Sequence, residues 1–250
     1  MATSKYFTVE VKPILPVATQ IASDKTDLQF AGGDLLFDWT SFEIPRGASK
    51  LIDISVIMRG AQTIKETDFF FAKTYNGDAP GSLGTGNATA DGVGYYKNML
   101  GAVVMDNSNF KDDLDNCIVG TLGHGASADQ IPSLVLEGEP ESGTNVGYDK
   151  FYIGATVSAA SFNFSTGILA DGAVTSGASS DITVKTVDAR NFFDVGDVIH
   201  VHDSNTAIGT ISSLPDATSI ILESANGVAI ANEDEIINAS PITLRLCFEK

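Results

Sequence analysis

The sequence predicts an all-β protein, an antiparallel β-sandwich with a small β-barrel inserted before its last strand. Short runs rich in Val, Ile and Phe alternate with Gly, Pro, Asn and Asp, and no strong amphipathic helix is found. A compact acidic stretch then precedes a final strand with clean alternation. We therefore expect two parts, residues 1–167 with 241–250 as the sandwich and residues 168–240 as the barrel.

The expected strands of the first part are short and bounded by turn residues. They are Tyr6–Val11, Leu35–Trp39, Leu51–Met58, Asp68–Ala72, Ala102–Met105, Phe151–Val157 and Ser161–Ser165. In the third run, every second side chain from Ile52 onward is apolar, whereas the opposite face carries Asp53 and Ser55. One consistently apolar face is typical of an antiparallel sheet that is covered on one side.

The stretch 168–240 has the turn spacing of a small barrel, with a break about every 8–12 residues. Its expected strands lie around Ala173 and at Asp181–Val187, Val198–Asp203, Ala207–Leu214 and Ser219–Glu223, and a short segment, DEIIN, closes it. This stretch holds 11 acidic and 2 basic residues, and so carries −9 of the net charge of −17.

The final segment, SPITLRLCFEK, is a half-buried strand in which apolar residues from Ile242 to Phe248 alternate with polar ones. It needs a partner outside the barrel. We expect that partner to be FYIGATVSAASFNFS, residues 151–165, so that the barrel is an insertion whose two ends lie close together. Two domains in tandem are the alternative.

Charge and composition exclude several classes of protein. A net charge of −17 repels nucleic acids and membranes with anionic lipids, so neither is expected as a partner. The first residues lack the pattern of a secretory signal, and no run reaches about 18 apolar residues. Cys117 and Cys247 form no CxxC motif, which leaves two buried thiols or one disulfide between them.

His200 and His202 are the candidates for metal ligands. Two residues apart on a strand, they share one face at a separation of about 7 Å. A third ligand is missing, because Asp203 falls on the opposite face and His124 is distant in the sequence. We therefore expect the apolar residues between them to fill the barrel and the histidines to face solvent. No metal or other cofactor is predicted; a metal shared on a symmetry axis is the alternative.

Signatures of catalysis are missing. The acid-rich segment DNSNFKDDLDN, residues 106–116, fails the EF-hand pattern at Lys111 and Cys117, which favours a solvated turn over an irregular calcium site. There is no G-x-S-x-G elbow or phosphate-binding loop. The single tryptophan, Trp39, lies in an apolar context typical of a core. No catalytic residue is assigned, and we expect a protein that is not an enzyme.

Two long stretches, Thr74–Gly94 and Glu137–Gly147, carry turn residues without periodicity. Long loops in compact domains are often binding or assembly elements. We predict contacts with neighbouring molecules at Asn76, Gly77, Pro80, Gly84, Asn87, Glu139, Pro140 and Asn145. Mobile surface loops are the alternative.

Two segments resemble known families. DARNFFDVGDVIHVHD and AIGTISSLPDATSIILESANGVAIANEDEII, within residues 188–237, resemble small β-barrel modules in virion proteins of tailed phages, particularly phages of marine bacteria such as cyanobacteria. FDWTSFEIPRGASKLIDISVIMRG, residues 37–60, resembles the jelly-roll and sandwich domains of capsid decoration and tail proteins.

The resemblance implies a virion structural protein without catalytic activity. It favours a decoration (cement) protein on the capsid surface, which stabilises the head shell as a homo-oligomer, a trimer, bound to the major capsid protein or other virion proteins after synthesis in the host cytoplasm. A tail, baseplate or fibre component with a receptor-binding tip is the alternative. A lectin or a carbohydrate-active enzyme is a third class.

Overall fold

The computed structural model describes residues 5–15, 30–60, 66–86, 88–91, 96–114, 116–123, 132–140, 150–158, 164, 166–202 and 207–250. In these ranges the regular structure consists of strands and two short 3-10 turns, Asn107–Asn109 and Ala189–Asn191. All strand pairs are antiparallel, which confirms the predicted all-β sandwich. No helix in this part of the chain is long and apolar enough to cross a membrane.

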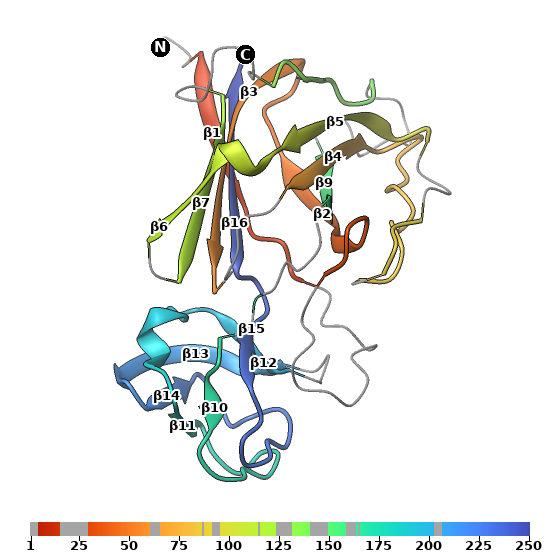
Figure 1. The fold of residues 1–250 in the computed structure, drawn as a ribbon. Coiled ribbons are helices and arrows are strands. Elements are labelled where there is room, and N and C mark those ends of the chain that lie inside the picture. Colours follow the sequence, from red (N-terminus) through yellow and green to blue (C-terminus); the bar gives the residue numbers. More distant parts are fainter. Residues whose placement is uncertain are drawn as a thin grey trace.

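The first part is a jelly roll of two facing sheets (Figure 1). One sheet has the order β1-β16-β3-β7-β6 with β8 beside β3, and the other has the order β2-β9-β4-β5. The strand bounds are β1 Tyr6–Val11, β2 Leu35–Glu43, β3 Ser49–Arg59, β4 Thr67–Lys73, β5 Met99–Met105, β6 Phe110–Leu114, β7 Cys117–Leu122, β8 Val135–Leu136, β9 Lys150–Val157 and β16 Ile242–Glu249. The eight principal strands are these ten without the short strands β6 and β8. Counted along the chain, the first, eighth, third and sixth form one sheet, and the second, seventh, fourth and fifth form the other, which is the jelly-roll order.

The jelly roll corrects the predicted partner of the last strand. β16 pairs with β1 and β3, whereas β9, its expected partner, lies in the opposite sheet. Consecutive seventh and eighth strands of a jelly roll cross from one sheet to the other, so the chain between them must bridge the sandwich. The predicted strand Ser161–Ser165 lies outside the described residues apart from Phe164.

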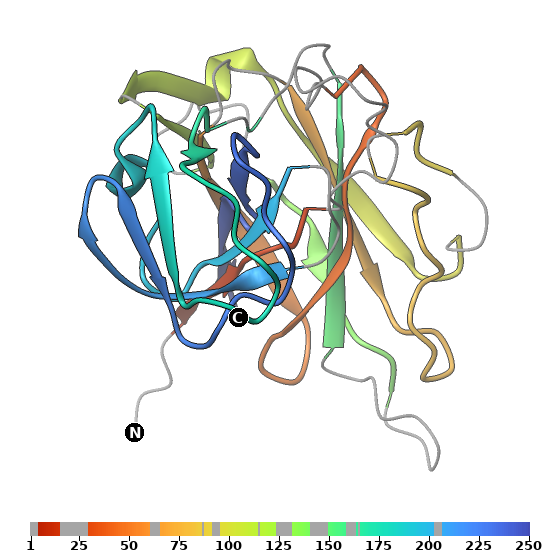
Figure 2. The same ribbon diagram turned by 90° about the horizontal axis from the view of Figure 1, so that it is seen from below.

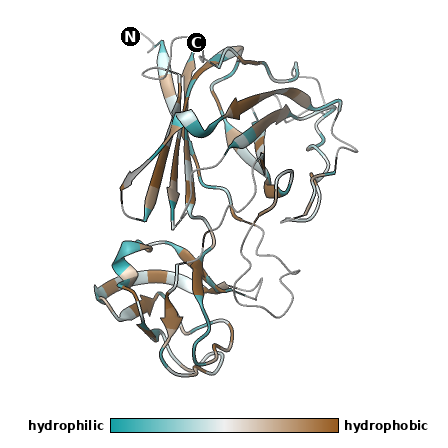
Figure 3. Ribbon diagram, in the orientation of Figure 1, coloured by the Kyte–Doolittle hydropathy of each residue, from teal (hydrophilic) through white to brown (hydrophobic). Residues whose placement is uncertain are grey.

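The core of the sandwich comes from the inward faces of both sheets (Figure 3). In β3, Ile54, Val56 and Met58 are buried as predicted. Leu51 is also buried, whereas Ile52 is partly exposed, because the register with β16 shifts so that Leu51 and Asp53 face consecutive partners. This β-bulge moves Leu51 to the inner face, which strict alternation assigns to the other side.

The barrel is a separate unit with its own apolar core, drawn entirely from residues between Ile168 and Ile236. Its strands are β10 Leu169–Ala170, β11 Asp181–Lys185, β12 Val198–Val201, β13 Ala207–Asp216, β14 Ser219–Leu222 and β15 Ile236–Asn238, in the order β10-β11-β14-β13-β12-β15. An isolated β-bridge joins Leu169 of β10 to Glu235, the residue before β15, and so brings the first and last strands of the barrel together. The strands curve round toward a closed ring (Figure 2).

The chain enters and leaves the barrel at one point, which we call the neck (Thr166–Ile168 with Glu235 and Ile236). The buried carboxylate of Glu235 accepts hydrogen bonds from the backbone N–H groups of Thr166 and Gly167, at 2.8 and 2.9 Å. The Thr166 hydroxyl donates to the Ile236 carbonyl at 2.7 Å, and the Ile236 N–H donates to the Ile168 carbonyl at 2.9 Å. The two crossing segments are therefore fixed to each other.

The two cysteines are free thiols. Cys117 lies opposite Arg59 and Cys247 lies opposite Asp53, on strands that flank β3 on opposite sides. Six residues along a strand correspond to about 20 Å, whereas a disulfide needs Cα atoms within about 7 Å. The geometry therefore decides against a disulfide between them. Burial raises the pKa of Cys117, and the nearby Arg59 lowers it by less.

Candidate functional site

The two loops that were predicted to make assembly contacts meet each other. Asn76 and Gly77 form the two-residue turn of a hairpin, with positive φ angles of 53° and 82° and hydrogen bonds between Tyr75 and Asp78. Their N–H groups donate to the buried carboxylate of Glu139, and the Gly77 bond measures 3.0 Å. The topology explains the meeting, because β4 and β9 are neighbours and the end of β4 lies beside the start of β9, so both loops are at the same end of these strands.

The remainder of the first loop covers the outer face of the four-stranded sheet. Leu83 is buried against Gly154. A Cβ atom added at Gly154 would lie 2.5 Å from the Cδ1 atom of Leu83. The indole N–H of Trp39 donates to the Gly81 carbonyl at 2.8 Å, and Asp38 accepts from the Leu83 N–H at 2.9 Å. The loop is therefore held by its own sheet, although it has no strand longer than a single bridge in the described residues.

The other predicted contact residues differ in exposure. Pro80 is buried, whereas Gly84 and Pro140 are exposed. Gly84 has a φ of +124°, a conformation that favours glycine. Asn87 and Asn145 lie outside the described residues. Whether any of these residues contacts a neighbouring molecule stays a prediction.

His200 and His202 are 7% and 5% exposed, which corrects the prediction that they face solvent. β12 and β15 lie on the side of the barrel next to the sandwich (Figure 1), and side chains on their outer face are buried as well as those on their inner one. Ile237, which pairs with His200 on that outer face, is also buried. The Leu15 N–H, from the segment after β1, donates to the Ala239 carbonyl at 2.8 Å.

These histidines have no metal-binding environment in the described ranges. No three His, Cys, Asp or Glu side chains gather there as a metal site requires. The Nε2 atom of His202 has no hydrogen-bond partner among the same residues. Asp203 and His124 lie outside the described residues.

In the acid-rich segment, Asp106 caps the turn Asn107–Asn109 by accepting from the Ser108 N–H at 2.8 Å.

A polar groove of about 420 Å³ lies between the sandwich and the barrel. In its lining, the Arg59 guanidinium at the end of β3 binds Asp194 and Asp197 of the barrel, each at 2.7 Å. The Asp197 carboxylate also accepts from the Asp194 N–H and the Asn238 amide, both at 2.8 Å. The sequence pattern did not single out Arg59, because its partners are 135 and 138 residues away.

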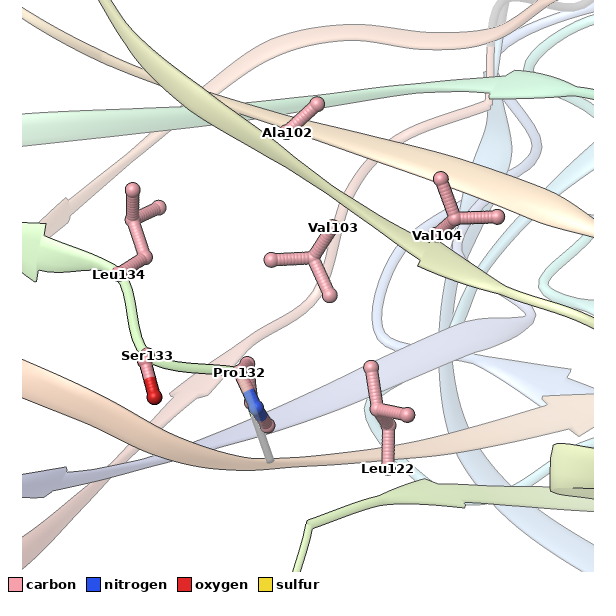
Figure 4. A pocket seen from close by; sticks show the side chains of 7 residues that line it. All are labelled: Ala102, Val103, Val104, Leu122, Pro132, Ser133 and Leu134. Atoms are coloured by element: carbon pink, nitrogen blue, oxygen red, sulfur yellow. The ribbon is translucent and has the colours of Figure 1, made fainter. Parts of the chain in front are cut away.

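A second groove, also of about 420 Å³, opens beside β5 and is mostly apolar (Figure 4). Val103 lies in it between Leu122 of β7 and Leu134. Val104, next to it on β5, is 58% exposed. The full lining is Ala102, Val103, Val104, Leu122, Pro132, Ser133 and Leu134. None of these side chains can ionise, so the groove suits an apolar contact better than chemistry.

The fold and these surfaces define a class: a jelly-roll protein that carries a nearly closed acidic barrel between its seventh and eighth strands. Comparison with known proteins finds no match, either to a protein-family model or to a curated protein.

Proposed function

We propose that this protein is a non-enzymatic structural component of a phage virion, a decoration protein that binds the outside of the capsid. The observation that carries the proposal is the barrel's place in the jelly roll. The chain ends lie together, since Tyr6 pairs with Glu249 and the Lys250 N–H donates to the Lys5 carbonyl, and the barrel is at the opposite end (Figure 1). A jelly roll is a frequent scaffold of capsid proteins.

The distribution of charge agrees with this arrangement. The barrel has 11 acidic and 2 basic residues in 73 positions, whereas the other 177 positions hold 21 acidic and 13 basic residues, a net charge of only −8. In the proposed orientation the jelly roll lies on the shell, and the barrel, with its net charge of −9, projects into solvent. Like-charged projections on neighbouring molecules repel each other, which keeps decorated particles apart in solution.

The test uses purified particles of the phage that encodes this chain. Immunogold electron microscopy and quantitative immunoblotting should show the protein over the whole head in hundreds of copies. Addition of the purified protein to particles that lack it should restore co-sedimentation. A few copies confined to the tail would favour the alternative, a tail or fibre component with the barrel as a tip. Complete absence from particles would refute both.

A further inference from the structure

We propose that Asn76 is a site of spontaneous deamidation through attack by the backbone nitrogen of Gly77, and that the Glu139 carboxylate slows this reaction. The inference is independent of the proposed function. The chain contains two Asn-Gly pairs, Asn76–Gly77 and Asn226–Gly227. Glycine hinders the attack least, because it has no side chain beside the attacking nitrogen. The surroundings of the two pairs differ, and they assign the reaction to the first.

The reaction needs only the chain and water. The Gly77 nitrogen forms a bond to Cγ of Asn76, the bond from Cγ to Nδ2 breaks, and ammonia leaves with the proton that the Gly77 nitrogen gives up. The product is a five-membered cyclic imide. Water then opens either of the two bonds from this nitrogen to a carbonyl carbon, which gives aspartate or isoaspartate. Each product adds one negative charge at neutral pH.

The Asn76 side chain is accessible for this reaction. Asn76 is exposed at the tip of the hairpin that the hydrogen bonds between Tyr75 and Asp78 close. In the part of the chain that the structure describes, its backbone N–H has a partner and its carboxamide has none. The carboxamide can therefore turn toward the Gly77 nitrogen, and water can reach the imide.

Asn226 has the same following residue but is held inside the barrel. It is 1% exposed, and the Gly227 N–H donates to the Ile208 carbonyl at 2.7 Å. The Asn226 carboxamide makes three hydrogen bonds to the backbone, with the Thr175 and Val228 carbonyls and the Ser179 N–H, at 2.9, 2.7 and 3.1 Å. Attack would break all of these bonds in a buried place, so the second pair is protected.

Glu139 opposes the reaction at Asn76. Its buried carboxylate accepts from the N–H groups of both Asn76 and Gly77, so the attacking nitrogen must first give up a charge-assisted hydrogen bond. That nitrogen also becomes negative when it loses its proton, and a carboxylate oxygen 3.0 Å away disfavours the charge. The two bonds fix a turn with φ angles of 53° and 82°, typical of a type I′ hairpin, whereas ring closure requires the Asn76 backbone to rotate.

Conversion at Asn76 would separate the two loops. Isoaspartate adds one atom to the backbone between the two N–H groups, so that the Glu139 carboxylate no longer matches both. The new carboxylate also repels Glu139, because the two like charges lie close together. The molecule would gain a negative charge and lose the contact between the loops that were predicted to meet neighbouring molecules.

The test is peptide mapping by mass spectrometry after incubation of the full chain at neutral pH, with digestion in acid, where the reaction stops. In the wild type, Asn76 should slowly acquire the mass change from NH₂ to OH, and Asn226 should stay intact. Glu139→Gln should convert Asn76 about tenfold faster, the factor that one charge-assisted hydrogen bond corresponds to. Trp39 fluorescence checks that E139Q is folded during the incubation.

The matched control is Glu137→Gln, which removes the same charge two residues earlier from an exposed side chain. E137Q should convert Asn76 within about twofold of the wild-type rate, because an exposed charge acts weakly through water. The wild type unfolded in urea is a reference that needs no variant. There, both pairs should convert at similar rates, whereas in the native protein Asn76 should be slower than in urea and Asn226 slower still.

Four results would each overturn the proposal. They are an intact Asn76 in both the wild type and E139Q, equal rates at Asn76 and Asn226 in the native protein, an E139Q rate no faster than that of E137Q, and a native Asn76 rate equal to that in urea.

Discussion

Replacement of Leu83 with alanine tests whether the long glycine-rich loop belongs to the fold. Leu83 is 1% exposed and lies on Gly154 of β9, although its segment has the composition of a free loop. Loss of a buried leucine costs about 2–5 kcal/mol. A loop can settle partly into the space, so we expect about 2–3 kcal/mol. For a chain of this size that corresponds to a fall in Tm of about 4–12 °C.

A double-mutant cycle with Gly154→Ala makes the test specific. The added methyl group would lie 2.5 Å from Leu83 and 3.3 Å from the Trp39 ring, so G154A alone should cost about 1–3 kcal/mol. In the L83A background the nearer obstacle is gone. The double mutant should therefore be more stable than the sum of the two changes by about 1–2 kcal/mol.

The assay is urea unfolding followed by the fluorescence of Trp39, the only tryptophan, which reports on the jelly roll. Val195→Ala, at a 66% exposed position on the barrel, is the control and should change the stability by less than about 0.5 kcal/mol. If L83A is as stable as this control, or if the two changes are strictly additive, the loop is not packed as the structure describes.

Three further predictions concern ionised groups. Arg59→Ala should cost about 1–2 kcal/mol and speed amide exchange around Asp197, and Arg59→Lys should recover only part, because lysine cannot hold both carboxylates. Glu139→Gln should cost about 1–2 kcal/mol, seen in urea unfolding and as a shifted Gly77 amide resonance. Hydrogen bonds from Thr218 lower the pKa of Asp216. The ionised Asp216 side chain therefore stabilises the folded state fully above about pH 3.9, and this contribution is lost as the pH falls through the lowered pKa. NMR titration should place that pKa below the ordinary aspartate value, and a value at or above it would contradict the assignment.

The sequence predicted most strands because alternation and turn residues are local signals. β7 was missed, since its sequence CIVGTL follows an acid-rich segment and contains Gly120, whose missing side chain makes room for the Phe110 ring. The sheet partner of β16 was wrong for a related reason. Alternation shows which side chains share a face, but the order of strands in a jelly roll depends on contacts between distant segments.

The candidate site was less predictable than the fold. Periodicity placed His200 and His202 on one face of a strand but could not show that this face is buried. The Asn-Gly pair at Asn76 is a strong local hairpin signal. Its hydrogen-bond acceptor, Glu139, is 63 residues further along the chain, and no local sequence pattern indicates that the two meet. β5 is visible as an uncharged run, but only the assembled sheet shows it to be an edge.

The neck has a consequence for how this chain could change over time. Its two crossing segments are tied by the Glu235 carboxylate and by the bond from Ile236 to Ile168, so the chain passes into and out of the barrel through neighbouring segments, beside the ion pairs of Arg59 with Asp194 and Asp197. The barrel is thus an inserted domain with its own apolar core. A lineage could exchange it for another domain, or shorten it to a tight connection, and the strands of the scaffold would keep their registers while the exposed face of the molecule became entirely different.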